Sequence, residues 1–433
     1  MGFGDQQVNN WNPWINYNVL QALMLIEKDP ERVRQGVWKL MKSTDFFFSM
    51  YHEDGACDEG PTYWSGASGY ALKFLDLLAK VTGNKVNIFN APLLRNMAQY
   101  IYRVHIGGNY FVNFADSAPK VSPSPGILYR YGELTGDPAM MKFASFMAQQ
   151  NQSFKDGVNG YFASALDELF MYKDIIGHPQ GEPLTGTYWF KDTQICVARD
   201  TEGKSDGFFF AAKGGNNQES HNHNDVGSCI LYYNALPVLI DAGVGTYTRQ
   251  TFGPERYTIW TMQSDYHNLP LINGTPQKNG REFAAHSQQY KATAKTVSYQ
   301  VDIAHAYPQE ANVKSWIRNY TLHRKKDFTI TDKWKLSACN EPSVLNLMTC
   351  CEVEIDRNKN ITLTGEAGRF KVEYDKKLLS PATDTVELTD PKLIHSWNRK
   401  KLTRIRFTIV SQQISGESKL VIRKVQYHKT LND

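Results

Sequence analysis

The spacing of hydrophobic residues changes once along the chain, and this change restricts the fold more than any other feature. Up to about residue 175, apolar side chains recur every three or four residues, which is typical of helices with one buried face. The runs span 14–26, 33–41, 70–78, 94–104, 128–134 and 140–147. From about residue 185, short runs alternate apolar and polar residues between turn residues. The pattern predicts roughly six helices with no strands between them, followed by antiparallel sheets.

The length of the chain indicates more than one domain. Its 433 residues exceed what one hydrophobic core usually organises. We expect an α+β chain with a helical domain over 1–180 and an antiparallel β-sheet domain over 185–433. The segment 177–186 contains Pro179, Gly181 and Pro183 and is the expected linker.

Two helix ends carry sequence signals. Asp29-Pro30 is expected to separate the first helix from the second, because proline cannot continue the preceding helix. Gly83-Asn84 is expected to cap the helix that starts near Tyr70, because both residue types tolerate left-handed backbone.

A histidine-rich segment, His221-Asn-His-Asn-Asp-Val-Gly227, stands out in the β region. Alternating apolar residues over 231–240 predict a hairpin turned at 234–237, and the histidine segment is expected to enter this hairpin as a strand. Residues two apart in a strand point to the same face, so His221 and His223 are predicted to project together.

The same region supplies further groups that bind metals. Asp241 follows the second predicted strand, and His267 lies in a loop whose Asn-Leu-Pro and Asn-Gly pieces suit turns. Imidazole nitrogens together with a carboxylate oxygen are the ligands that a borderline divalent cation uses. The alternative, that these are ordinary polar strand and loop residues, stays open at this point.

Two polar loops mark the helical region. Val8-Asn-Asn-Trp-Asn-Pro13 precedes a helix that Pro13 is expected to open as its first residue. The segment 54–64 is rich in Asp, Glu and Gly and leads through Tyr63 into the next helix. Helix capping is the simpler interpretation of each loop.

Composition excludes several classes of function. The net charge is only +4, which argues against extensive nucleic-acid binding but leaves a local basic patch open. No apolar run is long enough to span a bilayer. The six cysteines form no CxxC pair and do not identify a redox compartment. The chain starts without a basic, apolar leader, so we expect no signal peptide in it, either because the protein is cytoplasmic or because its true N-terminus has been removed.

Three of these segments together resemble the heparinase II/III family of polysaccharide lyases. They are His221–Gly227, Leu239-Ile-Asp-Ala-Gly243 and Tyr266-His-Asn-Leu-Pro270, and the resemblance extends over nearly the whole chain. It implies an α/α-toroid followed by an antiparallel β-sandwich or sheet domain. Six helices are about half of a toroid of six hairpins, so Met1 is expected to lie inside the toroid.

The resemblance also implies functional residues. The expected catalytic residues are Asn10, Tyr63 and His221. The expected substrate contacts are Trp11, Glu59, Arg256 and Asn268; Trp11 stands where many members have histidine. The expected ligands of one structural zinc ion are His223, Asp241 and His267.

These residue types suit β-elimination at a uronate. Removing the C5 proton is difficult because the neighbouring carboxylate is already negative, and Asn10 with His221 is expected to hydrogen-bond that carboxylate. Tyr63 is expected to act as the base and then to protonate the leaving O4. A phenol with a pKa of about 10 needs nearby positive charge, for which His221, Arg256 and Arg249 are candidates. His221 is the alternative base for the opposite C5 configuration.

We therefore predict a periplasmic or secreted lyase whose partner is an anionic polysaccharide, with neither nucleic acid nor membrane as a partner. Heparan-type glycosaminoglycan is the first substrate expected, and hyaluronan, chondroitin or alginate the second. A catalytically inactive glycan-binding paralogue is one alternative. A zinc hydrolase is another, and it is disfavoured because the chain has no His-Glu-x-x-His motif.

Overall fold

The computed structural model describes residues 8–152 and 162–426. The chain divides into two compact units, the first formed by 1–111 with 120–183 and the second by 112–119 with 184–433. The short segment Val112–Pro119 lies far from the rest of the second unit in sequence, and the hydrophobic pattern alone does not separate it from the helices around it.

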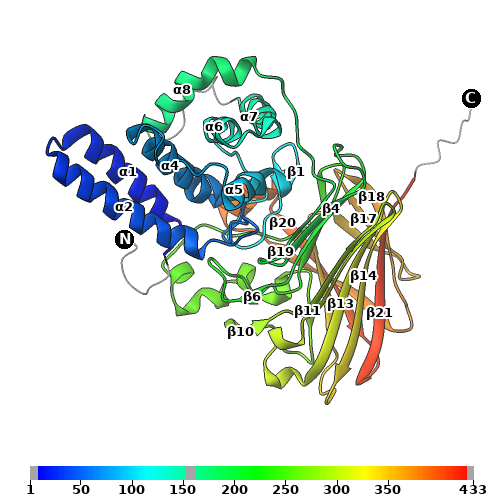
Figure 1. Ribbon diagram of the computed structural model, residues 1–433. Coiled ribbons are helices and arrows are strands. Elements are labelled where there is room, and N and C mark those ends of the chain that lie inside the picture. The colour runs from blue at the N-terminus through cyan, green and yellow to red at the C-terminus, as the bar shows by residue number, and fades with distance from the viewer. Residues whose placement is uncertain (1–7, 153–161, 427–433) are drawn as a thin grey trace, which may run out of the picture. The chain divides into compact units, whose positions relative to one another are not determined.

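The first unit is helical (Figure 1). Its α-helices are α1 (Trp11–Ile26), α2 (Pro30–Met50), α3 (Pro61–Trp64), α4 (Tyr70–Val81), α5 (Pro92–Arg103), α6 (Pro125–Thr135), α7 (Pro138–Gln150) and α8 (Phe162–Gly177). Every predicted run corresponds to one of these helices, and α3 and α8 are additional. The expectation of no strands was wrong, because β1 (His105–Gly107) and β2 (Tyr110–Phe111) form a short hairpin. Strands of this length are too short to show a period.

The two helix-end signals were read correctly. Asp29 is the N-cap of α2, where its carboxylate accepts hydrogen bonds from the backbone N–H groups of Glu31 and Arg32, and Pro30 follows as the first helical residue. After α4, Gly83 and Asn84 both adopt positive φ, at 59° and 61°. The Asn84 N–H donates to the Ala79 carbonyl at 2.7 Å, which closes the helix end.

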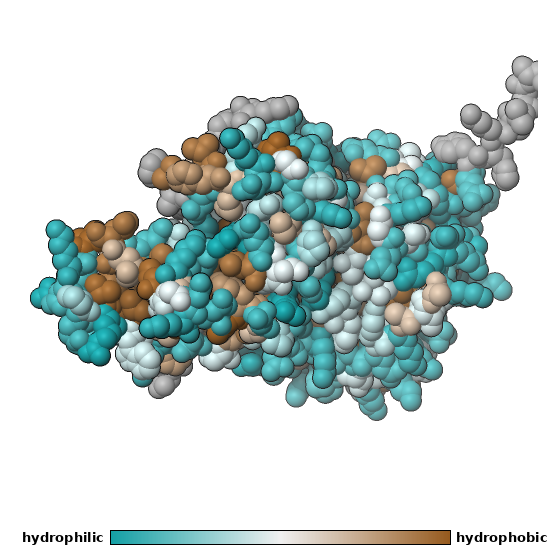
Figure 2. Space-filling view, turned by 45° about the horizontal axis from the view of Figure 1, so that its top comes forward, coloured by the Kyte–Doolittle hydropathy of each residue, from teal (hydrophilic) through white to brown (hydrophobic). Residues whose placement is uncertain are grey.

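Several helices of the first unit carry apolar side chains on exposed faces. The side chains are exposed by 84% at Leu25 and 74% at Ile26 in α1, and by 80% at Phe170 in α8. Figure 2 shows hydrophobic residues gathered over the helical unit. Large apolar patches of this kind are uncommon on surfaces that stay in water. None of the helices in the described part of the chain is long and apolar enough to cross a membrane.

The second unit consists of antiparallel sheets (Figure 1). A five-stranded sheet has the order β3 (Thr187–Phe190), β4 (Ile195–Arg199), β5 (Phe208–Lys213), β7 (Cys229–Tyr233), β8 (Leu236–Leu239). An eight-stranded sheet has the order β11 (His286–Ala292), β12 (Thr296–Asp302), β13 (Val313–His323), β14 (Asp327–Leu336), β21 (Ser415–Lys424), β18 (Gly368–Glu373), β17 (Ile361–Gly365), β16 (Glu352–Ile355). A four-stranded sheet has the order β19 (Leu379–Glu387), β20 (Lys401–Ile409), β15 (Val344–Thr349), β9 (Pro270–Leu271). Outside these sheets, β6 (Asn216–Asn217) pairs with β10 (Gly280–Ala284), and α9 (Pro391–Trp397) precedes β20.

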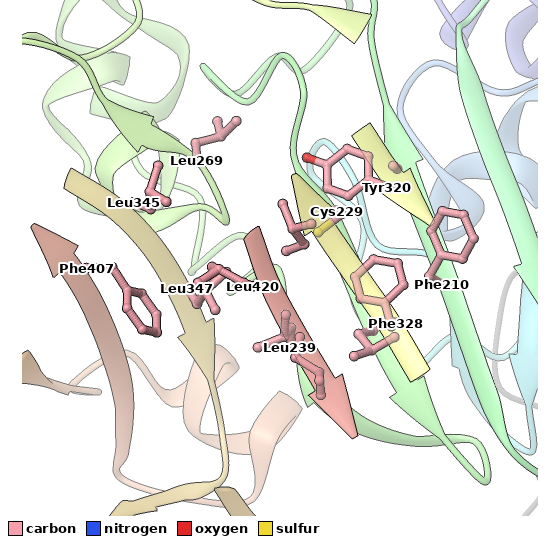
Figure 3. Packing of buried hydrophobic residues seen from close by; sticks show 14 of the residues in the cluster. Phe210, Cys229, Leu239, Leu269, Tyr320, Phe328, Leu345, Leu347, Phe407 and Leu420 are labelled. Atoms are coloured by element: carbon pink, nitrogen blue, oxygen red, sulfur yellow. The ribbon is translucent and has the colours of Figure 1, made fainter. Parts of the chain in front are cut away.

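All three larger sheets contribute side chains to one hydrophobic core. Phe210 of β5, Phe328 of β14 and Leu345 of β15 belong to the same buried cluster, and Figure 3 shows ten of its side chains labelled. Strand β13 alternates buried and partly exposed residues, as the sequence pattern predicts for a strand with one buried face. By contrast, β5 and β15 are buried along their whole length. The apolar run of β5 extends from Phe208 to Ala212, whereas β15 contains the buried Asn346, whose amide donates to the Leu269 carbonyl at 3.1 Å.

The predicted hairpin before Asp241 is present as β7 and β8. Asn234 and Ala235 form its turn with φ values of 52° and 59°, which matches the two-residue turn that suits twisted strands. The turn is shorter than expected, since Leu236 and Pro237 already belong to β8.

Candidate active site and metal cluster

The histidine-rich segment does not form the predicted strand. Residues 218–228 run in turns and irregular backbone between β6 and β7, and His221 adopts a left-handed φ of 54°. All residues from Asn222 to Gly227 are buried, whereas a strand with one buried face would expose every second residue to solvent. His221 and His223 are still directed to a common place, for a reason that lies in another segment of the chain.

That reason is Asp116, whose side chain is fully buried. Its Oδ2 lies 2.7 Å from His221 Nδ1 and accepts a hydrogen bond from the Tyr247 hydroxyl, also at 2.7 Å. Its Oδ1 lies 3.0 Å from His223 Nε2 and 2.8 Å from Arg256 Nη2. One carboxylate thus holds both histidines, a tyrosine and an arginine.

The electrostatics at Asp116 favour its ionised form. Burial by itself would raise the pKa of this carboxyl group. The hydrogen bonds to His221 and His223 and the charge of Arg256 outweigh burial, and they hold the pKa of Asp116 well below its ordinary value. Asp116 is therefore a permanent acceptor that determines which nitrogen of each imidazole carries a proton.

Sequence reasoning missed Asp116 because it lies 105 residues before His221. A partial signal was present, since Asn113-Phe-Ala-Asp-Ser117 places polar residues beside apolar ones with no helical period. In the structure, Ala115 adopts a φ of 56°, and the whole segment packs in the second unit. Non-glycine residues in this backbone region are concentrated at functional sites.

Arg256, for which a contact with substrate remains a prediction, makes several hydrogen bonds within the second unit. Besides Asp116, its guanidinium donates to the carbonyl of Asn222 at 3.0 Å and to the carbonyl of Thr251 at 3.1 Å. These bonds tie the loop that carries Arg256 to the histidine segment. The side chain is only 11% exposed.

Asn268 also makes its hydrogen bonds inside the second unit. It is fully buried, and its amide nitrogen donates to the carbonyls of Cys229 and Ile240 at 2.6 and 3.0 Å. Its amide oxygen accepts from the Met348 N–H at 2.7 Å. The structure thus gives Asn268 a structural role in place of the predicted contact with substrate.

The three predicted metal ligands do come together. His223, Asp241 and His267 are fully buried, and each offers a ligand atom within 4.8 Å of the others. Asp241 follows β8, and His267 follows the 3-10 turn Ser264–Tyr266. Zinc bound to nitrogen and oxygen at about 2.0–2.2 Å in a tetrahedron needs ligand atoms roughly 3.4 Å apart, so the side chains would have to draw together on binding an ion.

The hydrogen bonds of the cluster orient both imidazoles. His267 Nε2 lies 3.1 Å from the Thr261 carbonyl, which can only accept, so Nε2 carries the proton and Nδ1 is left as the acceptor of the neutral ring. That Nδ1 lies 3.1 Å from Asp241 Oδ2, another acceptor. In the same way Asp116 requires the proton on His223 Nε2, and His223 Nδ1 is buried with no hydrogen-bond partner among the described residues.

Three buried acceptor atoms that face one another require a proton or a cation between them. Burial by itself would lower the pKa of His267, but the charge and hydrogen bond of Asp241 outweigh it and raise that pKa. Burial would likewise raise the pKa of Asp241, yet His267 holds it below the ordinary value. The residues therefore fit a divalent cation, and Asp116 supplies the carboxylate behind a ligand histidine that such sites usually have.

The remaining predicted residues lie in the first unit. The asparagines near Trp11 have separate tasks, because Asn9 accepts from the Trp11 N–H at 3.1 Å while Asn12 is buried and donates to Ser43 Oγ at 3.1 Å. Asn10 is half-buried at the N-terminus of α1 and makes no capping hydrogen bond with its side chain. Helix α1 begins at Trp11, so Pro13 lies within its first turn rather than at its first position.

Tyr63 lies in α3 and is half-buried. The neighbouring Trp64 is fully buried and donates to the Met97 carbonyl at 2.7 Å, which anchors the turn that carries Tyr63. The following residues Ser65–Gly69 form a π-helical turn, a feature often found at functional sites. Glu59 is buried, and Trp11 is 59% exposed.

Asn10 and Tyr63 belong to the first unit and His221 belongs to the second. The catalytic centre predicted from all three, with His221 facing the helical domain, therefore stays a prediction. What the structure establishes is the surroundings of each residue within its own unit.

The chain combines a helical unit with an antiparallel β unit that contains a buried cluster of histidine and aspartate. This combination defines the class of protein to which the chain is similar. The family described as heparinase II/III-like, C-terminal, matches residues 188–420, and the chain belongs to this family. No protein of curated function matches the chain in sequence.

Solved structures of a similar fold include a heparinase, a heparan sulfate lyase and a chondroitin lyase. A heparinase III is 16% identical with a TM-score of 0.70, and the match covers 96% of this chain and 62% of that one. The heparan sulfate lyase HepC from Pedobacter heparinus is 15% identical with a TM-score of 0.67, covering 97% and 60%. A chondroitin AC lyase from Streptomyces coelicolor A3 is 10% identical with a TM-score of 0.55, covering 97% and 61%. The chain thus spans about three fifths of each of these proteins.

Proposed function

We propose that the protein is a polysaccharide lyase that cleaves a uronate-containing anionic chain by β-elimination, with a heparan-type glycosaminoglycan as the first candidate. The observation that carries this proposal is the buried Asp116, which orients His221 beside the metal-compatible cluster. The family match and the similarity in fold to a heparinase and a heparan sulfate lyase support the same class of reaction.

His221 is suited to act on the substrate through Nε2. Asp116 accepts a hydrogen bond from Nδ1, so the neutral ring has its lone pair on the other nitrogen. The side chain is 23% exposed, whereas Asp116 behind it is fully buried. A carboxylate in this position fixes the orientation of the ring and stabilises its protonated form, as in other enzymes that use an Asp–His pair.

In the proposed reaction Asn10 and His221 hydrogen-bond the uronate carboxylate, which spreads the negative charge that develops when the C5 proton leaves. Tyr63 removes that proton and returns it to O4 of the leaving sugar. For a substrate of the opposite C5 configuration, His221 is the base.

We also propose that His223, Asp241 and His267 hold one zinc ion. The support is chemical, since two imidazole acceptors and a carboxylate face one another in a buried site. Such an ion would be structural, joining the histidine segment to the strand end at Asp241 and the loop at His267. No step of the elimination is assigned to it.

The finer architecture of the family is part of the proposal. The first unit would be a portion of an α/α-toroid, and the exposed apolar faces of α1 and α8 are of the kind that neighbouring helical hairpins cover. The sheets of the second unit would form the sandwich. A polymeric substrate of this kind also favours a periplasmic or secreted location.

The test is a panel of uronate polysaccharides incubated with the protein while ultraviolet absorbance is recorded. Unsaturated uronate ends absorb and would establish the lyase, with a variant that carries both Tyr63→Phe and His221→Ala as the negative control. New reducing ends without absorbance would indicate a hydrolase. Binding without either product would favour the glycan-binding alternative and overturn the enzymatic proposal.

A further inference from the structure

A group of basic residues lines two neighbouring cavities in the β unit, away from the histidine segment in sequence. The loop between β4 and β5 meets the β11–β12 and β13–β14 hairpin turns around a cavity of about 730 Å³. A neighbouring cavity of about 380 Å³ shares Asp200, Thr201, Lys325 and Lys326 with it. We call the two cavities together the hairpin groove.

Cationic side chains dominate the lining of the hairpin groove. They are Lys204, Lys295, Arg324, Lys325, Lys326 and Lys424. The acidic side chains there are Asp200, Glu202 and Asp206, so six positive charges minus three negative charges leave an excess of +3. The whole chain has a net charge of only +4, so this excess is a local concentration of positive charge.

One of the three carboxylates is already occupied by the backbone. Asp200 Oδ1 accepts from the Lys325 N–H at 2.8 Å, and its Oδ2 accepts from the Phe208 N–H at 2.7 Å. Asp200 therefore acts as the anchor of the β13–β14 turn, and much of its charge is compensated by these N–H groups.

The cations are held on a fixed framework. The Arg324 N–H donates to the Lys295 carbonyl at 2.9 Å, which joins the two hairpin turns. Its guanidinium donates to the carbonyl of Arg199 and, at 3.1 Å, to that of Asp200. Lys325 and Lys326 at the tip of the turn are exposed. These hydrogen bonds fix the backbone of the turns from which the lysine side chains project, so the turns themselves need no ordering when a polyanion binds.

The groove also offers an aromatic ring beside a cation. Tyr233 and Phe208 line the smaller cavity, and Lys424 Nζ lies 5.1 Å from the Tyr233 ring centroid. A tyrosine ring has an apolar face that can cover the C–H face of a sugar, while its hydroxyl stays polar. The remaining carboxylates, Glu202 and Asp206, can accept hydrogen bonds from sugar hydroxyls.

We propose that the hairpin groove is a second binding site for a sulfated or carboxylated polysaccharide, separate from the site at His221. The choice of a glycan as ligand rests on the proposed function, whereas the anion site itself rests on the charges and framework of the groove. In this arrangement a long chain is held at the groove while another part of it reaches the histidine site.

The test compares two double variants in a background that carries both Tyr63→Phe and His221→Ala, so that neither proposed base remains and the ligand stays uncleaved. Lys325→Ser with Lys326→Ser removes two charges from the groove. Lys333→Ser with Lys335→Ser removes two exposed charges from elsewhere on β14 and is the matched control. Isothermal titration with a heparin decasaccharide at two salt concentrations gives the Kd of each.

We expect at least a fivefold rise in Kd for the groove variant, a shallower salt dependence, and less than a twofold change for the control. Equal losses in both variants, or no loss in either, would overturn the site. A duplex DNA of the same charge as the decasaccharide serves as a second ligand. If it binds the parent protein as tightly as the decasaccharide does, and loses the same affinity in the groove variant, the groove binds polyanions in general and not glycans in particular.

Where this background does not fold, the two double variants are made in the otherwise unchanged chain and compared by the salt needed to elute them from immobilised heparin. Earlier elution is expected only for the groove variant. The result is independent of catalysis. If the protein has no lyase activity but the groove variant still shows the fivefold rise in Kd, the proposed binding site stands and the proposed function is contradicted.

Discussion

The carboxylate of Asp116 and the imidazole of His221 lie 2.7 Å apart although 105 residues separate them in the chain. The other oxygen of the same carboxylate reaches His223, a residue of the metal-compatible cluster. The orientation of the proposed catalytic histidine and that of a proposed metal ligand are therefore coupled through one buried side chain.

Asp116→Asn tests this coupling. The amide keeps the shape but cannot accept from both imidazoles and Arg256 as a charge does, so we expect activity and metal affinity to fall by about 10–100-fold. The fall should appear in kcat more than in KM and be accompanied by an altered pH profile. Asp332→Asn removes another buried aspartate that pairs with an arginine, Arg318, and should destabilise by about 3–5 kcal/mol while leaving the activity per folded molecule unchanged. An Asp116→Asn protein with parental kinetics would contradict the positioning role.

Removal of metal should destabilise the protein, and increasingly so as the pH rises. Without a cation, His267 has a raised pKa because of Asp241, so its stabilising proton is present below the unfolded value of about 6.5 and is lost as pH rises through the folded value. A bound cation replaces that proton and binds more tightly as the pH rises. The difference in Tm between zinc-loaded and chelator-treated protein should therefore grow from pH 6 to pH 9. His267→Ala should abolish the difference and His305→Ala, an exposed histidine, should retain it.

Tyr63→Phe removes a single hydroxyl group, so folding and glycan binding should persist. Elimination should fall by several orders of magnitude, because both proton transfers are lost. Asn10→Ala should also spare the fold and cost roughly 3–4 kcal/mol of transition-state stabilisation, as for the loss of an oxyanion-hole donor. Initial rates of unsaturated-end formation measure both. Parental rates in both variants would place the catalytic centre elsewhere.

His221→Ala separates two roles for the histidine. If His221 only supports the carboxylate, substrates of either C5 configuration should lose activity to a similar extent. If it is the base for one configuration, that epimer should lose nearly all activity while the other keeps much of it. Rates on paired substrates that contain glucuronate or iduronate decide between the two roles.

Asn268→Ala should act on stability alone. It leaves the carbonyls of Cys229 and Ile240 and the N–H of Met348 without their partner in the interior. We expect a loss of about 1–3 kcal/mol in the free energy of unfolding, measured by denaturant titration. If the variant has normal stability and a raised KM, Asn268 contacts the substrate, as the family resemblance implied.

Features that depend on near neighbours could be predicted from the sequence. The cap at Asp29, the helix end at Gly83 and the turn at Asn234 each follow from the backbone preferences of a few adjacent residues. The change from helical to alternating period identified the two kinds of secondary structure for the same reason. The three metal-ligand candidates were found through a resemblance to a family, and the structure brought them together.

The histidine segment shows where local reasoning fails. A strand was predicted because two histidines stand two apart, yet the segment is irregular and buried, and both rings reach Asp116. The predicted convergence is present, but it is produced by a partner from a distant segment rather than by the period of a strand.

The sequence by itself determined the change from helices to strands, two helix ends, the location of the hairpin before Asp241 and the residue types available for chemistry. Only the tertiary structure decided which of these residues act together. It brought Asp116 to His221, engaged Arg256 with backbone carbonyls and buried Asn268 in the interior. The physical reason is that backbone preferences act over a few residues, whereas the role of a polar side chain depends on its burial and on the partners that packing brings from elsewhere in the chain.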